Sequence, residues 1–167
     1  MGRSLNIKNL VPRKNAATKQ GYYKIIYPEK YVGDYSKIIF RSSWEQKFAT
    51  FCDINAQVVK WSSESIQIPY LHPIQNKTCI YNLDFYMKVR QADGTFTEFI
   101  IEVKPSKKLE KPTLPTSRLT EKRILAHNEQ MKEYAINMHK FQTAKKWAED
   151  RGWQFMIVTE KFLYGNQ

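Results

Sequence analysis

Three ionisable residues near the middle of the 167-residue chain have types and spacing that could carry chemistry. Glu102 and Lys104 stand two positions apart in EFIIEVKPSKK (98–108), and Asp84 lies in the preceding apolar segment YNLDF. Successive side chains of a strand point to opposite faces, so Glu102 and Lys104 share one face. Two carboxylates brought close together repel unless a cation lies between them. Hard oxygen ligands of this kind select Mg²⁺ or Mn²⁺ over zinc.

The register of a hairpin decides whether these residues meet. Segments 80–89 and 97–103 are predicted as two strands, and a two-residue turn would mix apolar and charged side chains on both faces. A three-residue loop, Ala92-Asp93-Gly94 with Gly94 left-handed, gives a better pairing. It places apolar pairs on one face, namely Leu83 with Val103, Phe85 with Ile101 and Met87 with Phe99. On the other face Asp84 lies opposite Glu102, with Lys104 beside them.

This set of residues suits metal-dependent hydrolysis of phosphodiesters. A bound metal neutralises the scissile phosphate and lowers the pKa of a bound water. Lys104 can orient that water or stabilise the developing charge. A salt bridge between Glu102 and Lys104 at an exposed strand end is the alternative, because E-x-K is short and common.

Composition points to a nucleic acid as the partner. The formal charge is +11 and the pI is about 9.6, so we expect a polyanion, nucleic acid before an anionic membrane, with solubility alone as the alternative. Hydrophobic residues make up 42 % of the chain, and no apolar run approaches the roughly 18 residues of a membrane span. Cys52 and Cys79 fit no metal or disulfide framework and indicate free thiols in a reducing compartment.

The remaining pattern predicts one domain after a basic arm. Residues 1–30 are predicted as a basic N-terminal arm and residues 31–167 as the domain. Helices are predicted from Ser42 to Ile54–Asn55 and from about 120 to 150, each with an apolar stripe. Further strands are expected at 58–61, 65–70 and 153–158. The order α-β-β-β-β-α-β predicts an α/β fold, with a mixed β-sheet flanked by helices.

The motifs resemble a known superfamily. YNLDF…EFIIEVKP resembles the PD-(D/E)XK nuclease motif, with Leu83 where the family name has Pro. The likeness extends from about residue 31 to 163, over the segments FRSSWEQKFATFCD, VVKWSSESIQIPY and IVTEKFL. Over this range the chain resembles the endonuclease subunit of cut-and-paste transposons. It resembles still more closely the head-completion nucleases of T-even-like tailed phages. The resemblance implies a restriction-endonuclease-like fold.

The resemblance also implies roles for individual residues. Asp84 and Glu102 would be metal-binding catalytic carboxylates, Lys104 the catalytic lysine, and the backbone carbonyl of Val103 a further metal ligand. Glu45 would complete the catalytic and metal site. From the residues alone, Ser42-x-x-Glu45 is favoured as a capping box, in which Glu45 reaches back to the Ser42 N–H, whereas the resemblance favours the metal.

Other charged residues have two interpretations each. The lysines that follow the catalytic strand are candidates for DNA phosphate contacts, or else ordinary solvated side chains: Lys107, Lys108 and Lys111. Glu64, in WSSES, either supports the site or is a solvated edge charge.

The function implied by the resemblance is a Mg²⁺ (or Mn²⁺)-dependent deoxyribonuclease that leaves a 3′-hydroxyl and a 5′-phosphate. It would process packaged DNA in phage head completion and head–tail joining. Its partners would be DNA and portal or neck proteins, with no membrane, and its location the host cytoplasm during assembly or the virion head–neck region. Two alternatives are a non-catalytic DNA-binding structural protein of the head or neck, and a transposase-associated endonuclease subunit. The short C-terminus argues against the second, since that subunit normally carries a further domain.

Overall fold

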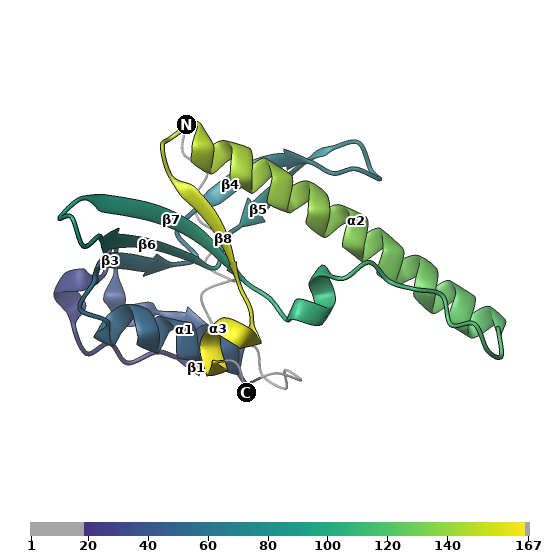
Figure 1. Ribbon diagram of the computed structural model, residues 1–167, viewed down its shortest axis with the longest axis horizontal. Helices are drawn as coiled ribbons and strands as arrows, with labels where there is room; N and C mark the ends of the chain where they lie inside the picture. Colours follow the sequence, from purple (N-terminus) through teal and green to yellow (C-terminus); the bar gives the residue numbers. More distant parts are fainter. Residues whose placement is uncertain (1–18, 166–167) are drawn as a thin grey trace.

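A four-stranded mixed sheet lies between two helical layers in the computed structural model, which describes residues 19–165 (Figure 1). The sheet runs in the order β3 (Val58–Ser63), β6 (Phe85–Arg90), β7 (Phe96–Val103) and β8 (Gln154–Val158). Neighbouring strands of this sheet are antiparallel, except β7 and β8, which are parallel. α1 (Ser43–Ile54) and α3 (Glu160–Tyr164) cover one face, and α2 (Glu121–Glu149) covers the other.

Smaller elements complete the fold. β4 (Gln67–Leu71) and β5 (Thr78–Asn82) form a separate hairpin under α2, and β1 (Gly21–Tyr22) pairs with β2 (Ile39–Phe40). Short 3₁₀ turns span Pro28–Lys30, Tyr35–Lys37 and Ser106–Leu109. The predicted order of the large elements is confirmed, except that five strands rather than four lie between α1 and α2.

Both predicted long helices begin and end close to the predicted positions. The Ser42 hydroxyl accepts a hydrogen bond from the Glu45 N–H (3.1 Å) at the start of α1, and Asn55 follows its last residue. Thr120 caps α2 in the same way, and Asp150 follows it. A polar side chain that accepts from the first free N–H groups stabilises a helix start, which explains why these boundaries could be predicted.

The predicted hairpin register is confirmed from Phe85 onward. Phe85 pairs with Ile101, and Met87 pairs with Phe99. The Gln91 N–H donates to the Thr95 carbonyl (2.8 Å), which leaves a three-residue loop between them. Gly94 closes this loop with φ +84°, a left-handed conformation that costs a glycine little.

The expected strand 80–89 is wrong at one point, because it breaks into β5 and β6 at Leu83 and Asp84. The Leu83 N–H donates to the Ile66 carbonyl (3.0 Å), and the Asp84 carbonyl accepts from the Glu64 N–H (2.9 Å). These bonds draw the chain away from β7 and into the β4–β5 hairpin. Leu83 therefore packs beneath α2 instead of pairing with Val103 on the α1 face.

Each face of the sheet has its own apolar core. The cluster on the α1 face includes Phe48, Trp61, Phe85, Met87, Ile101 and Val158. The cluster on the α2 face includes Ile68, Tyr70, Tyr81, Leu83, Ile100, Phe141 and Ala144. Because β7 is buried on both faces, a charged residue on it needs partners.

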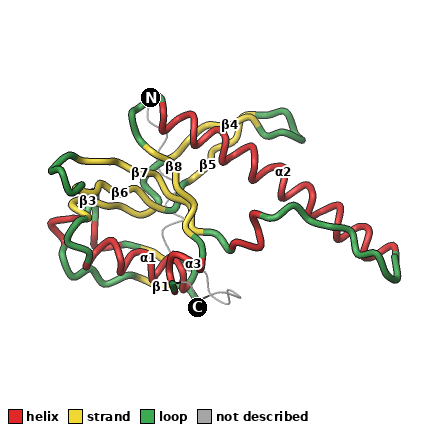
Figure 2. The backbone as a smooth tube through the Cα atoms, in the orientation of Figure 1, coloured by secondary structure: helices red, strands yellow, loops and turns green. Residues whose placement is uncertain are grey.

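The N-terminal half of α2 extends beyond the sheet (Figure 1). The segment between Leu109 and Glu121 has no regular structure and runs back beside it (Figure 2). The two are joined where the Arg123 guanidinium donates to the Ser117 carbonyl (2.7 Å). Only the C-terminal half of α2 therefore packs on the sheet, and that half faces the predicted site.

Two predictions from composition can also be compared with the structure. Cys52 and Cys79 are both free thiols, as expected. Among residues 19–165, no helix combines the length and the apolar character needed to cross a membrane.

The buried carboxylate of Asp53 fastens the segment before α1 to the end of that helix. It accepts hydrogen bonds from the Tyr23 hydroxyl (3.0 Å) and from the N–H groups of Ile26 (2.7 Å) and Tyr27 (3.0 Å). The Lys30 ammonium donates to the last carbonyls of α1, including that of Asp53 (2.6 Å). Residues 21–30 of the predicted arm thus pack against α1, and residues 1–18 lie outside the described residues.

Replacing Asp53 should loosen this segment. Asp53→Ala leaves two N–H groups and a hydroxyl without their acceptor, which should cost about 2–4 kcal/mol of unfolding free energy. Urea denaturation measures the loss, and limited trypsin digestion should cut faster at Lys24 and Lys30. Asp150→Asn, at an exposed helix end, is the control and should leave the urea midpoint nearly unchanged. An unchanged midpoint for Asp53→Ala would contradict the role given to Asp53.

Candidate active site

Glu102 lies on β7 beneath α2 and is only 8 % exposed. Both oxygens of its carboxylate are bound, to Tyr81 and to Lys104. Oε2 accepts from the Tyr81 hydroxyl (2.9 Å), and Oε1 accepts from the Lys104 ammonium (3.0 Å). A nearly buried carboxylate with two such donors is held in one orientation, because either donor would lose its partner if the side chain turned.

Lys104 follows the last residue of β7 and faces α2. Besides Glu102, its ammonium contacts the Asn137 side-chain oxygen (3.4 Å) and lies 5.6 Å from the centre of the Phe141 ring. Its backbone N–H donates to the Val158 carbonyl (2.8 Å), which continues the pairing with β8. The salt bridge considered for Glu102 and Lys104 therefore exists, but at a half-buried position rather than an exposed strand end.

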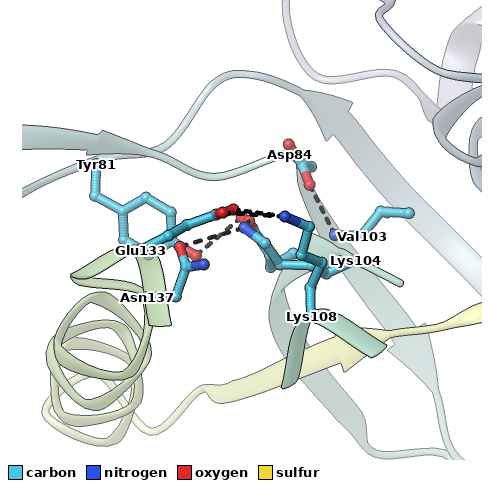
Figure 3. Close-up of polar contacts among 8 residues, drawn as sticks. Tyr81, Asp84, Val103, Lys104, Lys108, Glu133 and Asn137 are labelled. Atoms are coloured by element: carbon cyan, nitrogen blue, oxygen red, sulfur yellow. Dashed lines mark hydrogen bonds and ion pairs between the residues drawn. The ribbon is translucent and has the colours of Figure 1, made fainter. Parts of the chain in front are cut away.

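Asp84 stands where the β6–β7 ladder stops. Its Oδ2 accepts a hydrogen bond from the Val103 N–H (2.7 Å), so a side-chain oxygen takes the place of a strand carbonyl (Figure 3). The paired register ends one step earlier, at Phe85 with Ile101, and the bond to the Val103 N–H holds Asp84 beside the end of β7. The structure thus gathers Asp84, Glu102, Val103 and Lys104 at one end of the hairpin.

The charges of the acidic residues interact. Burial is the largest cause that raises the pKa of Asp84 well above its usual range, and the carboxylates of Glu102 and Glu45 raise it further. The Val103 N–H and Lys104 act in the opposite direction and offset only part of this. Three carboxylates from α1, β7 and the β5–β6 junction thus share one electrostatic environment.

Glu45 takes part in the N-terminal cap of α1, which is one of the two roles considered for it. Its Oε2 accepts from the Arg41 N–H (2.8 Å), and its Oε1 accepts from the Ser42 hydroxyl (3.0 Å). The bond therefore reaches the N–H of Arg41, one residue before the Ser42 N–H expected of a capping box. Burial raises the pKa of Glu45, and the nearby Glu64 adds to this increase.

Glu64 links the start of α1 to Asp84. Its carboxylate forms a two-pronged ion pair with the Arg41 guanidinium (2.5 and 3.1 Å), and its N–H donates to the Asp84 carbonyl (2.9 Å). Glu64 has φ +50°, a left-handed conformation that costs a residue with a side chain about 1 kcal/mol or more. Such strain is kept where neighbouring bonds hold it, and here those bonds position Asp84.

The donor set has the chemistry that a hard divalent cation prefers. Its ligands would be carboxylate oxygens and a backbone carbonyl, with no sulfur or imidazole. Among residues 19–165, no three acidic, His or Cys side chains converge on a common point, because the carboxylates are bound to protein donors instead. The oxygen atoms are of the type that a divalent cation prefers, and a positive charge among them would offset the carboxylate repulsion that adds to burial in raising the pKa of Asp84.

The three lysines proposed for DNA contacts differ in their surroundings. Lys108 forms an exposed ion pair with Glu133 of α2 (3.0 Å). Lys107 and Lys111 are exposed. All three follow β7 on or beside the turn Ser106–Leu109, close in the chain to Lys104.

Two partners of the site were missed in the sequence. Tyr81 lies on β5 and Asn137 on α2, and both are nearly buried. Asn137 carried a signal, because it is a polar residue between Tyr134 and Phe141 on the apolar stripe of its helix. Tyr81 carried none, since an aromatic residue in a strand is ordinary core.

The chain belongs to a family of endonucleases. A family profile described as "TnsA-like endonuclease N terminal" matches residues 55–160. This membership implies a restriction-endonuclease-like fold, and the four-stranded mixed sheet with its flanking helices agrees with it. The chain is therefore a nuclease of a family that hydrolyses phosphodiester bonds.

A particular relative is the head completion nuclease of Enterobacteria phage T4. The two sequences are 37 % identical over 134 residues, which span 80 % of this chain and 86 % of the phage protein. The resemblances to the transposon endonuclease subunit and to phage head-completion nucleases are thereby confirmed.

Ionisation of Asp84 should destabilise the folded, metal-free protein as the pH rises. Its pKa is raised in the folded state, so between its unfolded and folded pKa values the folded protein binds more protons, and stability falls as the pH increases. Asp84→Asn keeps an oxygen for the Val103 N–H but removes the charge. In EDTA near about pH 8 its Tm should exceed the wild-type value by on the order of 3 °C, and the gap should close near about pH 4. A lower Tm for Asp84→Asn at both pH values would contradict this.

Proposed function

We propose that this chain is a divalent-metal-dependent deoxyribonuclease that processes packaged DNA during phage head completion, before the head joins the tail. The observation that carries the proposal is the grouping of Asp84, Glu102 and Lys104 at one end of the β6–β7 hairpin in a chain of the endonuclease family. The named role of the phage relative supports the biological setting.

The metal would be held by oxygen atoms at this site. Asp84, Glu102, Glu45 and the Val103 carbonyl are the proposed ligands of Mg²⁺ (or Mn²⁺). When bound, the ion would neutralise the scissile phosphate and lower the pKa of a water molecule. The other roles belong to the chain itself. Tyr81 fixes the orientation of Glu102, and Asn137 restrains Lys104.

The position of Lys104 supports the role proposed for it. Its ammonium lies 3.0 Å from Glu102, within reach of a water or phosphate oxygen next to that carboxylate. There it would orient the attacking water and stabilise the negative charge that develops on the phosphate. The expected products are a 3′-hydroxyl and a 5′-phosphate.

The proposed partners follow from charge and from the relative. With a net charge of +11, the chain is suited to DNA, and Lys107, Lys108 and Lys111 would contact phosphates beside the cut. Portal or neck proteins of the head are the proposed protein partners. The protein would work in the host cytoplasm during assembly or at the head–neck region of the particle.

Removing any of the three central side chains should abolish DNA cleavage. Plasmid nicking in Mg²⁺ by Asp84→Asn, Glu102→Gln and Lys104→Met should fall by about 10²-fold or more. Each variant loses a charge that would either bind the metal or stabilise the reacting phosphate. EDTA should stop the wild-type reaction. Glu98→Gln is the matched control, because Glu98 lies on the same strand and pairs with Lys88 (3.6 Å).

Two results would contradict the catalytic proposal. One is equal nicking by the wild type and the three variants. The other is no cleavage by the wild type in Mg²⁺ or Mn²⁺ while duplex DNA is still bound, which would favour a non-catalytic DNA-binding protein of the head or neck.

A pair of variants separates the two roles of Glu45. Glu45→Gln keeps an oxygen for the Arg41 N–H, so its stability should change little, but cleavage should fall if the carboxylate binds the metal. Ser42→Ala removes the helix cap and should cost about 1 kcal/mol, with cleavage retained. Thermal unfolding and plasmid nicking are measured for both. Full activity of Glu45→Gln would assign Glu45 to the helix cap alone.

A further inference from the structure

Lys140 is a cation of the α2 layer that the proposed reaction has not used. It lies on α2 one turn after Asn137, on the side that faces the β4–β5 hairpin. Its ammonium lies 5.4 Å from the centre of the Tyr70 ring and 5.3 Å from the centre of the Tyr81 ring. Because Tyr81 donates to Glu102, Lys140 is joined to the site through a single side chain.

No carboxylate of the described residues forms an ion pair with this ammonium, although Glu102 lies near enough to favour its charge. Three other lysines of the same helix have carboxylate partners, namely Lys132 with Glu129, Lys145 with Glu149, and Lys146 with Asp150. Among residues 19–165, Lys140 forms no ion pair, and the two ring faces are its contacts. Partly burying an ammonium without an ion-pair partner costs free energy, and an anion that binds from outside the chain would offset that cost.

The surroundings of Lys140 also disfavour its charge. Burial is the main cause that lowers its pKa, the nearby positive charge of Lys104 lowers it further, and the carboxylate of Glu102 offsets only part of this. Two ammonium groups thus lie near one another, while the single carboxylate of Glu102 is already bound to one of them. A bound anion would stabilise both, which is the arrangement expected where a polyanion passes.

The rings decide which part of a nucleic acid fits here. Tyr70 and Tyr81 are only 6 % and 4 % exposed, so neither can offer a face for base stacking. The accessible group is the ammonium, which can bind a phosphate oxygen but carries no means of telling bases apart. The feature therefore suits the DNA backbone.

We propose that Lys140, held over the rings of Tyr70 and Tyr81, is a second phosphate-binding site that takes a backbone phosphate next to the scissile one. This proposal rests on the proposed deoxyribonuclease function. Lys104 would serve the reacting phosphate and Lys140 a neighbour on the same strand. The C-terminal half of α2 would then lie along the backbone and set the position of the cut without reading sequence.

The dependence of DNA binding on salt tests this proposal without any cleavage. The affinity of the full chain for a short duplex is measured in EDTA over a range of NaCl concentrations. Lys140→Gln should lower the affinity and make the slope of log K against log salt shallower by about 0.9, the value expected when the protein neutralises one phosphate fewer. Lys140→Arg keeps the charge and should retain the wild-type slope.

Lys47→Gln is the matched control. Lys47 also lies over an aromatic ring, with its ammonium 3.6 Å from the centre of the Tyr164 ring, but it belongs to α1 on the opposite face of the sheet. This variant removes the same charge from the same kind of ring contact. A slope that falls equally in Lys47→Gln and Lys140→Gln would overturn the proposal, because the effect would then come from net charge.

Neutral phosphates locate the contact on the wild-type protein itself. A set of duplexes, each with one methylphosphonate near the cleavage site, is tested for binding in EDTA and for cleavage in Mg²⁺. One neutral phosphate beside the cut should weaken wild-type binding, and Lys140→Gln should be insensitive to that substitution while still sensitive to others. Equal sensitivity of both proteins at every position would overturn the proposal.

Failure of this proposal is distinguishable from failure of the proposed function. If the wild type cleaves DNA but Lys140→Gln binds and cleaves as the wild type does, only the second phosphate site is wrong. If the wild type binds duplex DNA but does not cleave it in any metal, the nuclease proposal is wrong. The salt slopes still decide whether Lys140 contacts phosphate.

Discussion

The hydrogen bond from the Val103 N–H to the Asp84 carboxylate is the interaction on which the arrangement of the site depends (2.7 Å). It lies where β6 leaves its ladder with β7, so a side chain continues a pattern that the backbone has ended. The departure is required by the β4–β5 hairpin, whose bonds to Leu83 and Asp84 pull the chain beneath α2. Were the strand continuous, Leu83 would pack on the α1 face, and Tyr81 would not be presented to Glu102 from β5.

The same junction explains how a strongly basic chain keeps acids together. Asp84, Glu102 and Glu45 repel one another, and each carboxylate has its own hydrogen-bond donors. Asp84 accepts from the Val103 N–H, Glu102 from Tyr81 and Lys104, and Glu45 from groups at the start of α1. Displacing any of these donors would leave a carboxylate without its hydrogen-bond partner. The repulsion that remains is what a divalent cation would relieve.

The sequence predicted what depends on local rules. The register followed from side-chain alternation and Gly94, the start of α1 followed from the cap at Ser42, and α2 followed from its apolar stripe. It did not predict the break at Leu83, since YNLDF reads as unbroken strand and the break is caused by bonds to residues 64 and 66. Tyr81 and Asn137 were missed for the same reason, because their roles arise only when β5 and α2 pack over β7.

Glu45 shows how the cap and a metal could be coupled. Both of its oxygens are bound at the start of α1, so a metal could gain this ligand only if the bonds to the Arg41 N–H or the Ser42 hydroxyl were shared or broken. Losing a cap costs about 1 kcal/mol, which is modest beside the repulsion among buried carboxylates that a divalent charge offsets. Arg41 stays tied to Glu64 in either case, so the chain before α1 keeps its place when Glu45 turns. If the proposed metal binds, only the start of α1 would therefore need to adjust, while the bonds that hold Asp84 and Glu102 to β7 and its neighbours stay in place.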